Sequence, residues 1–325
     1  MDTVATFNLG GFPHHSSIQS TAAVSLKKRA VPLTRLELRN KIGLRAVLQS
    51  SSSSTTSQWD LFVRNYNGNW VGKTTWYDRD ELRNTLDFQN AAEAIESRYN
   101  ISFSDPDTGI WEGYGLRFSN GTRILPLSRS TYNLQGSVWQ FPGAGGLGSL
   151  VVDQNTNKSM QEVYFFHENV GAMILVIFSK EASKNGRLVL KSVGTLPFVR
   201  QSGSQVFAKP ELDTHKKELR NILDTISGWQ GQRMSLGPKA ALPERSDACG
   251  KFDSSPYLTS PFSASLEAGL VLAVPEYIDS TTPPFEMRFG CLQSRNLFKQ
   301  VVISFDAEGK LAQWTYDVYS PPAAP

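Results

Sequence analysis

The sequence is poor in the residues that metal sites, disulfide frameworks and membrane spans require. Its 325 residues include two cysteines, Cys249 and Cys291, and only four histidines. Because these residues are few and scattered, we expect no metal site, and we expect both cysteines to remain free thiols in a reducing compartment. No stretch approaches the roughly 18 consecutive apolar residues of a membrane helix, so we expect no membrane span.

An excess of positive charge is also missing once the N-terminal segment is set aside. The chain carries 33 Lys and Arg against 30 Asp and Glu, and residues 1–47 hold seven of the basic residues but only two of the acids. The remainder therefore has 26 basic and 28 acidic residues. It lacks the excess of positive charge with which proteins bind phosphate backbones, so we expect no nucleic-acid partner.

Residues 1–47 predict a chloroplast transit peptide. The segment is rich in Ser, Thr and Arg, poor in acids, and has no uninterrupted apolar core of the kind that secretory signals contain. No second apolar signal follows, which favours the stroma over the thylakoid lumen. The Ser- and Thr-rich residues 48–58 then predict a flexible lead-in to the folded part.

The folded part predicts an all-β protein with minor helix, divided into two modules. Ten short β-prone runs separated by turn residues occupy most of 59–200, which predicts an antiparallel, up-and-down barrel. Residues 80–99 alone predict a helix there, or a helix followed by the start of a strand. A linker at 201–216 leads to a second, smaller barrel-like module at 217–320, where Gly309 predicts the turn of a final hairpin.

A Trp-x-Gly triplet follows a short amphipathic segment twice, at Trp70–Gly72 and at Trp229–Gly231. Each preceding segment places apolar residues at helical spacing. We expect each module to begin with a short helix that closes one end of its barrel. The Gly would then relieve crowding where strands approach closely.

This pattern resembles the calycin superfamily, which includes lipocalins, fatty-acid-binding proteins and the phycobilin lyase-like proteins of cyanobacteria. The resemblance rests on Gly68–Trp70–Gly72 with Trp76–Tyr77, and on Gly228–Trp229–Gly231. The mature chain also resembles an uncharacterised plastid and cyanobacterial family with two calycin-like parts. The resemblance implies lipocalin-like barrels and, through the lyase relatives, tetrapyrrole handling. It identifies no catalytic residue.

Arg117 is the most interesting chemical feature of the predicted strand at 109–118. Alternation puts Trp111, Gly113, Gly115 and Arg117 on one face, so the guanidinium could project into a cavity and hold a carboxylate or phosphate. Arg123 follows an "SNGT" turn and is expected near Arg117 across a hairpin. The alternative is a solvent-facing Arg117 beside strand-bend glycines.

Aromatic residues and one histidine complete the set of candidate ligand-binding residues. His167 shares a strand face with Val163 and Phe165, so it would end a cavity row as a polar anchor; an exposed strand-end His is the alternative. For Trp139 and Tyr164 the alternative to a cavity wall is core packing. The full set is Arg117, Arg123, Trp76, Trp111, Trp139, Tyr164 and His167.

Two further patterns argue against nucleotide binding and against acid–base chemistry. Gly143–Gly148 has the spacing of a dinucleotide loop but is followed by a β-prone run instead of a helix, so we expect a mobile loop at a barrel mouth and no cofactor. Glu112, Glu162 and Glu168 are scattered and predict no catalytic pair.

The sequence favours a stromal binding protein that encloses an apolar or amphipathic small molecule, such as a tetrapyrrole, a carotenoid derivative or a lipid, in its first barrel. The alternative is a non-catalytic assembly or structural factor that docks on a plastid protein complex. The third hypothesis is an isomerase or lyase on the same scaffold. A filled interior would favour the second, and a buried Tyr, His or Glu with a shifted pKa the third.

Overall fold

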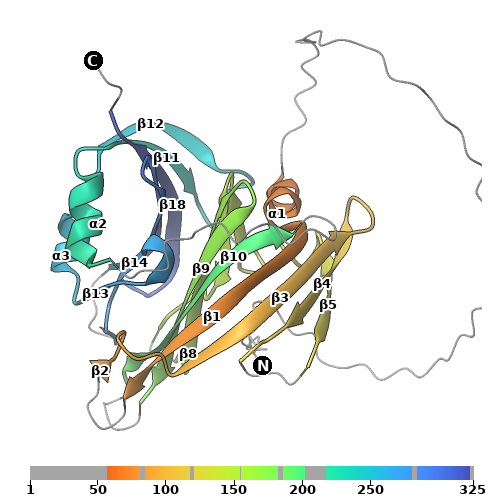
Figure 1. The fold of residues 1–325 in the computed structure, drawn as a ribbon, viewed down its shortest axis with the longest axis horizontal. Helices are drawn as coiled ribbons and strands as arrows, with labels where there is room; N and C mark the ends of the chain where they lie inside the picture. The colour runs from red at the N-terminus through yellow and green to blue at the C-terminus, as the bar shows by residue number, and fades with distance from the viewer. Residues whose placement is uncertain are drawn as a thin grey trace, which may run out of the picture.

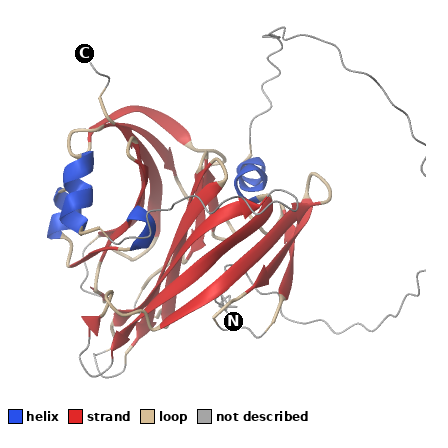
Figure 2. Ribbon diagram, viewed as in Figure 1, coloured by secondary structure: helices blue, strands red, loops and turns tan. Residues whose placement is uncertain are grey.

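The computed structural model describes most of the chain from the first helix onward. The described residues are 57–80, 85–117, 121–153, 155–181, 186–201, 217–279 and 284–322. The predicted transit peptide (1–47), and nearly all of the predicted flexible segment and linker, lie outside them. The fold is mostly β, as predicted, with antiparallel strands in two curled sheets and few helices (Figure 2).

The first sheet is an up-and-down meander curled into an open barrel. Its strand order is β5-β4-β3-β1-β10-β9-β8-β7-β6. Pairing of β1 with β10 joins the two halves of the meander, whereas β5 and β6 stand at the two ends of the order and leave the barrel open between them. Its strands are β1 (Gly68–Asp80), β2 (Thr85–Leu86), β3 (Glu93–Phe103), β4 (Thr108–Tyr114), β5 (Arg123–Ser128), β6 (Val138–Phe141), β7 (Ala144–Gly148), β8 (Lys158–His167), β9 (Val170–Lys180) and β10 (Leu188–Gln201).

The second sheet has seven strands in the order β12-β11-β18-β17-β16-β14-β13. The predicted final hairpin joins β17 to β18, and Gly309 adopts φ +70° at its turn, as expected. The short β15 (Tyr277–Ile278) belongs to the first sheet, where it pairs with β10. The elements are α2 (Leu219–Ile226), β11 (Gln230–Leu236), β12 (Glu244–Lys251), α3 (Ser255–Thr259), β13 (Phe262–Ser265), η2 (Glu267–Gly269), β14 (Leu270–Val274), β16 (Phe285–Ser294), β17 (Leu297–Phe305) and β18 (Leu311–Ser320).

The helix α1 (Gln58–Tyr66) lies at one end of the first barrel (Figure 1). A capping box starts it: the Ser57 hydroxyl accepts the Asp60 N–H, and the Asp60 carboxylate accepts the Ser57 N–H. Trp59, Phe62 and Tyr66 form its buried stripe, so this end of the barrel is closed by aromatic rings. None of the helices in the described part of the chain is long and apolar enough to cross a membrane.

The two sheets pack back to back through a shared apolar core. The ring of Trp139 on β6 lies 6.0 Å from that of Trp314 on β18, and Phe141 lies 5.4 Å from Tyr316. All four side chains are almost fully buried. Figure 1 shows α2 and α3 on the opposite side of the second sheet, where their apolar residues form a separate core with Phe298.

Strand alternation sorts the side chains of β8 between this shared core and the barrel interior. Val163 and Phe165 belong to the core between the sheets. Phe166 packs inside the first barrel, and Tyr164 packs against the same interior cluster. Because successive side chains of a strand point to opposite faces, packing of one face against the second sheet turns the other inward.

Polar contacts cross the boundary between the sheets as well. The buried Arg79 guanidinium on β1 donates to the Leu190 carbonyl and pairs with Glu276 at 2.9 Å. The Thr195 hydroxyl donates to the Glu267 carboxylate at 2.6 Å. These bonds satisfy groups that burial would otherwise leave unpaired, and those to Glu276 and Glu267 join the first sheet to the second module.

Two local predictions were wrong. No helix forms in the described part of 80–99, of which 81–84 lie outside the description. Residues 93–99 belong to β3 and pair with β1, which confirms the strand start that the alternative predicted but not the helix. The glycine run expected as a loop contains β7, whose five residues are buried. A Cβ on Gly146 would lie 2.2 Å from the Glu162 carbonyl oxygen, so close strand packing explains the glycine.

The two Trp-x-Gly triplets open β1 and β11 after helices, as expected. A Cβ on Gly72 would lie 2.2 Å from the Pro197 carbonyl oxygen, and one on Gly231 would lie 2.3 Å from Cys249 Sγ. Both glycines therefore relieve crowding between neighbouring strands. Trp70 packs into the barrel interior, with its ring 5.1 Å from that of Phe198.

We expect Trp314→Ala to lower the free energy of unfolding by about 3–5 kcal/mol, because it leaves a cavity in the core that both sheets share. Urea unfolding followed by circular dichroism should show one transition displaced as a whole. Ile124→Ala, at a side chain that is 63% exposed, is the control and should change stability by less than about 0.5 kcal/mol. Two separate transitions, only one of them displaced, would contradict the shared core.

Candidate functional site

The interior of the first barrel combines aromatic walls with a small polar cluster. Glu162 and Tyr164 come from β8, Tyr99 from β3 and Tyr66 from α1. The Tyr66 and Tyr164 rings are 5.1 Å apart, and Tyr99 lies 5.6 Å from Trp111. A carboxyl group and several phenols therefore lie close together inside an otherwise apolar chamber.

Glu162 is the unusual member of this cluster. Its side chain is 3% exposed; Oε1 accepts a hydrogen bond from the Tyr164 hydroxyl, and Oε2 has no partner among the described residues. Burial raises the pKa of Glu162 to about 7, and the Tyr164 hydrogen bond opposes the rise. The carboxyl thus changes charge near neutral pH with one oxygen unsatisfied.

The same environment suppresses ionisation of the phenols. Burial, followed by the charge of Glu162, raises the pKa of Tyr99 to about 12 and raises the pKa values of Tyr66 and Tyr164 well above their ordinary value. At physiological pH these side chains are neutral hydrogen-bonding groups. Glu162 is therefore the member of the cluster that titrates in this range.

Two small hollows adjoin the cluster, and Tyr99 and Tyr164 line both. One, of about 20 Å³, is walled by aromatic and aliphatic side chains that include Trp70 and Trp111. The other, of about 30 Å³, is lined by Glu162 together with Thr74, Trp76, Arg117 and others. Each has room for about one water molecule, so side chains largely fill the barrel in this conformation.

Arg117 lies at the edge of the polar hollow, and its charge is already paired. Its guanidinium makes a bidentate contact with Asp78, approaches Glu93 at 3.1 Å, and lies 4.8 Å above the Trp76 ring. The Arg117 hydrogen bonds lower the pKa of Asp78. Because two carboxylates hold the guanidinium, it is not a vacant anchor for a ligand's acidic group.

The geometry around Arg117 and Arg123 also differs from the predicted hairpin. β4 ends at Tyr114, and Gly115 takes a left-handed φ of +76°, which breaks the alternation before Arg117. Arg123 pairs in register with Gly113 instead of with Arg117. Arg123 therefore lies at the start of β5, beside Gly113 of β4 and not opposite Arg117.

The structure brings together Trp76, Trp111, Tyr164 and Arg117 around the two hollows, but not every predicted residue. Trp139 packs in the core between the sheets, so it cannot line the barrel interior. His167 is half-buried at the end of β8 and lines neither hollow. Val163 and Phe165, with which it was grouped, pack toward the second sheet.

Sequence reasoning missed Glu162, Tyr66 and Tyr99. The signal for Glu162 was present, because it stands at i, i+2 and i+4 with Tyr164 and Phe166 on one face of a strand. What the sequence could not reveal is that this polar face, and not the Val163–Phe165 face, points into the barrel. Tyr66 and Tyr99 come from elements distant in sequence that meet only on folding.

We expect Glu162 to make folding stability fall as pH rises. Its pKa is higher in the folded chain (about 7) than its ordinary value of 4.5, so its stabilising contribution is full below 4.5 and is lost as pH rises to about 7. The change is on the order of 3 kcal/mol. Urea midpoints at pH 5 and pH 8 should differ less in Glu162→Gln than in the wild type; an unchanged pH dependence would show that Glu162 titrates normally.

Comparison with known proteins shows a similar fold but no shared function. No family model matches the chain, and no curated protein matches its sequence. Among solved structures, a protein of unknown function of the DUF3598 family from the cyanobacterium Nostoc punctiforme is similar, with a TM-score of 0.60 and 16% identity over 82% of this chain and 99% of that chain. A putative thioesterase II from Thermobifida fusca aligns over 50% of this chain and 73% of that chain at 12% identity; its TM-score of 0.12 carries no argument. The chain therefore shares the all-β, half-barrel fold of the Nostoc protein, which is compatible with a calycin-like fold.

Proposed function

We propose that this protein binds a small amphipathic molecule in the interior of its first barrel, within the chloroplast stroma. The supporting observation is the buried Glu162 carboxyl, whose Oε2 has no partner among the described residues and which lines the polar hollow. A buried acceptor without a hydrogen bond is costly, and a ligand that supplies a donor recovers that cost.

The polar end of the ligand is an N–H or O–H donor and not an acid. Arg117 was the expected anchor for an acidic group, but Asp78 and Glu93 already pair with it. An acidic ligand would also meet the negative charge of Glu162 above about pH 7. Among the expected classes, pyrrole N–H groups of a tetrapyrrole and hydroxyl groups of a carotenoid derivative or lipid satisfy this requirement.

The apolar end of the ligand fits the aromatic half of the chamber. Trp70, Trp111, Phe166 and Phe198 line the smaller hollow and present ring surface without charge. Preformed sites of this kind combine mainly apolar walls with a few polar groups. The two hollows together therefore offer one polar and one aromatic end.

Binding requires Tyr164 to move, because its ring lines both hollows and each holds about one water molecule. Rotation of this partly buried side chain away from Glu162 joins the two spaces. The first barrel is also unpaired between β5 and β6, so a path to the interior need not break a strand pair. The proposed bound state therefore differs from the present one in side chains more than in sheet pairing.

The second candidate function is a non-catalytic assembly or structural factor for a plastid protein complex. The small size of the two hollows favours it, because a barrel filled by its own side chains works through its outer surface. The raised pKa of Glu162, beside the Tyr164 hydroxyl, favours the third function, proton transfer by an isomerase or lyase. The proposed binding function differs from both in one respect: the purified chain should retain a stoichiometric small molecule.

The first test is native mass spectrometry, with an absorption spectrum, on the chain purified from plastids. We expect a stoichiometric small molecule, retained at least tenfold less well by Glu162→Gln, because the amide removes the charge that strengthens the hydrogen bond. Retention should increase as pH rises through 7, where Glu162 ionises.

Glu96→Gln is the matched control, since Glu96 is an exposed carboxylate on β3 of the same barrel. It should retain the ligand as the wild type does. Equal retention by Glu162→Gln, or retention that does not depend on pH, would refute the Glu162 site. A ligand-free mass with a stoichiometric partner protein would favour the assembly factor instead.

A further inference from the structure

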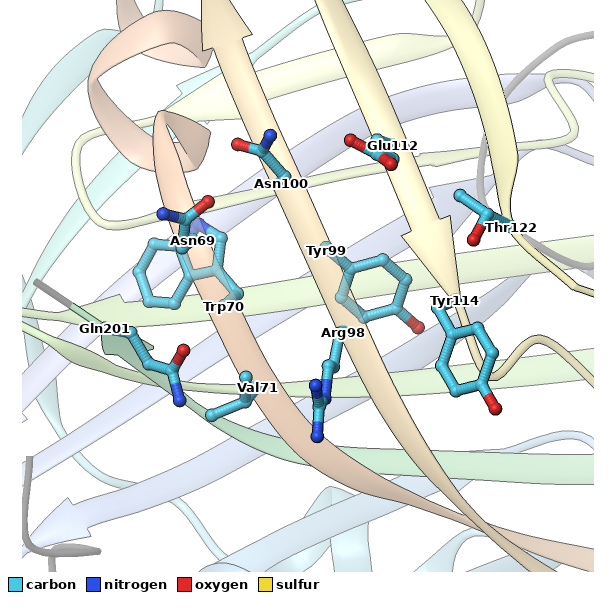
Figure 3. Close-up of a pocket in the computed structure, with 10 residues that line it drawn as sticks. All are labelled: Asn69, Trp70, Val71, Arg98, Tyr99, Asn100, Glu112, Tyr114, Thr122 and Gln201. Atoms are coloured by element: carbon cyan, nitrogen blue, oxygen red, sulfur yellow. The ribbon is translucent and has the colours of Figure 1, made fainter. Parts of the chain in front are cut away.

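A larger hollow lies over the outward face of the first sheet. Its volume is about 420 Å³, and it runs across the ends of four neighbouring strands, β10, β1, β3 and β4 (Figure 3). Most of its side chains are polar. It is lined by Asn69, Trp70, Val71, Arg98, Tyr99, Asn100, Glu112, Tyr114, Thr122 and Gln201.

Strand register arranges the outward side chains in two parallel rows. The first row crosses four strands as Gln201, Asn69, Asn100 and Glu112. The second row crosses three strands as Val71, Arg98 and Tyr114. Neighbouring strands are about 4.8 Å apart, so the first row presents three carboxamides and a carboxylate at a regular spacing along a line.

The carboxamides and charged groups of these rows have no partner in the described part of the chain. Among the described residues, the side chains of Asn69, Asn100 and Gln201 make no hydrogen bond or ion pair, and neither do those of Arg98 and Glu112. Asn69, Arg98 and Asn100 are exposed. The hollow therefore offers many donors and acceptors that only solvent or a ligand can satisfy.

The chemistry of the rows selects a neutral ligand rich in hydroxyl groups. A carboxamide donates and accepts at once, as a hydroxyl group does, so a line of carboxamides complements a line of hydroxyls. Arg98 and Glu112 contribute one charge of each sign, so the hollow attracts neither an anion nor a cation. A pyranose unit is about as long as the spacing between strands, which lets successive sugar rings meet successive strands.

An aromatic ring borders the rows at the position where a sugar ring would stack. Tyr114 ends the second row and is 52% exposed, which is unusual for a tyrosine on a sheet. Exposed aromatic faces pack well against flat apolar surfaces, and the C–H face of a pyranose is such a surface. Ile124 continues the apolar edge, because it pairs in register with Glu112 and is 63% exposed.

We propose that this outward face binds a neutral oligosaccharide, lying across β10, β1, β3 and β4 with its hydroxyl groups on the carboxamide row and one sugar ring on Tyr114. The proposed contacts are made by outward side chains of β1 and β3, whereas the Glu162 cluster is formed by inward ones. Trp70 and Tyr99 line the outer hollow and interior hollows as well.

The test is saturation-transfer NMR and titration calorimetry on the full chain with neutral hexasaccharides of glucose, xylose, mannose and galactose as probes. We expect at least one to bind the wild type. Tyr114→Ala, and separately Asn69→Ala with Asn100→Ala, should weaken that binding at least tenfold. Lys73→Ala is the control, because Lys73 is exposed on β1 outside the hollow, and it should bind as the wild type does.

The variants change exposed side chains, so their circular dichroism spectra should match that of the wild type. The proposal is wrong if no hexasaccharide transfers saturation to the wild-type chain, or if Tyr114→Ala binds as tightly as Lys73→Ala. It is also wrong if this face instead holds a protein that Tyr114→Ala releases. None of these outcomes bears on the interior site, because Glu162 contacts no residue of either row.

Discussion

The packing of the two sheets against each other is the constraint on which the rest of the structure depends. The outward face of β6–β10 is covered by the second sheet, through contacts such as Trp139 with Trp314. A strand has two faces, so this contact decides which side chains of β8 enter the barrel. Glu162 and Tyr164 are buried inside because Val163 and Phe165 are buried outside. The second sheet reaches β1 only in its second half, where Tyr77 joins the shared core and Arg79 pairs with Glu276. The outward side chains at the start of β1, such as Asn69, and those of Asn100 on β3 and Tyr114 on β4 stay exposed.

Burial then gives the interior its chemical character. In water Glu162 would be an ordinary carboxylate; here its pKa is about 7 because few polar groups replace its hydration. Arg117 has the opposite fate at the edge of the same chamber, where Asp78 and Glu93 neutralise it. Arg117, the expected anchor, is therefore already paired, whereas Glu162, which was not expected in the site, has an oxygen without a partner among the described residues. In the proposed function, a ligand would be selected by the hydrogen-bond donor that it brings to Glu162.

Predictions that rested on local sequence signals were confirmed more often than those that depended on tertiary contacts. The strands of the first barrel and the turn at Gly309 were predictable, since period-two patterns and turn residues are local signals. The helix preferred over 80–99 was wrong because its apolar stripe was weak, and pairing of residues 93–99 with β1 outweighed local propensity. The start of a strand, which was the alternative there, was confirmed. Trp111 and Tyr164 proved to be interior residues, whereas Trp139, with the same aromatic character, packs between the sheets. Composition does not distinguish these cases.

The amino-acid sequence alone determined the mostly-β class and the short helix before each Trp-x-Gly strand. It also determined which residues of a strand share a face. These properties depend on backbone alternation and on neighbours a few residues apart. The inward or outward direction of each face, the meeting of Glu162 with Tyr66 and Tyr99, and the pairing of Arg117 with Asp78 depended on the tertiary structure. Each of them joins segments distant in the chain, and a local pattern carries no information about which distant segment will cover it.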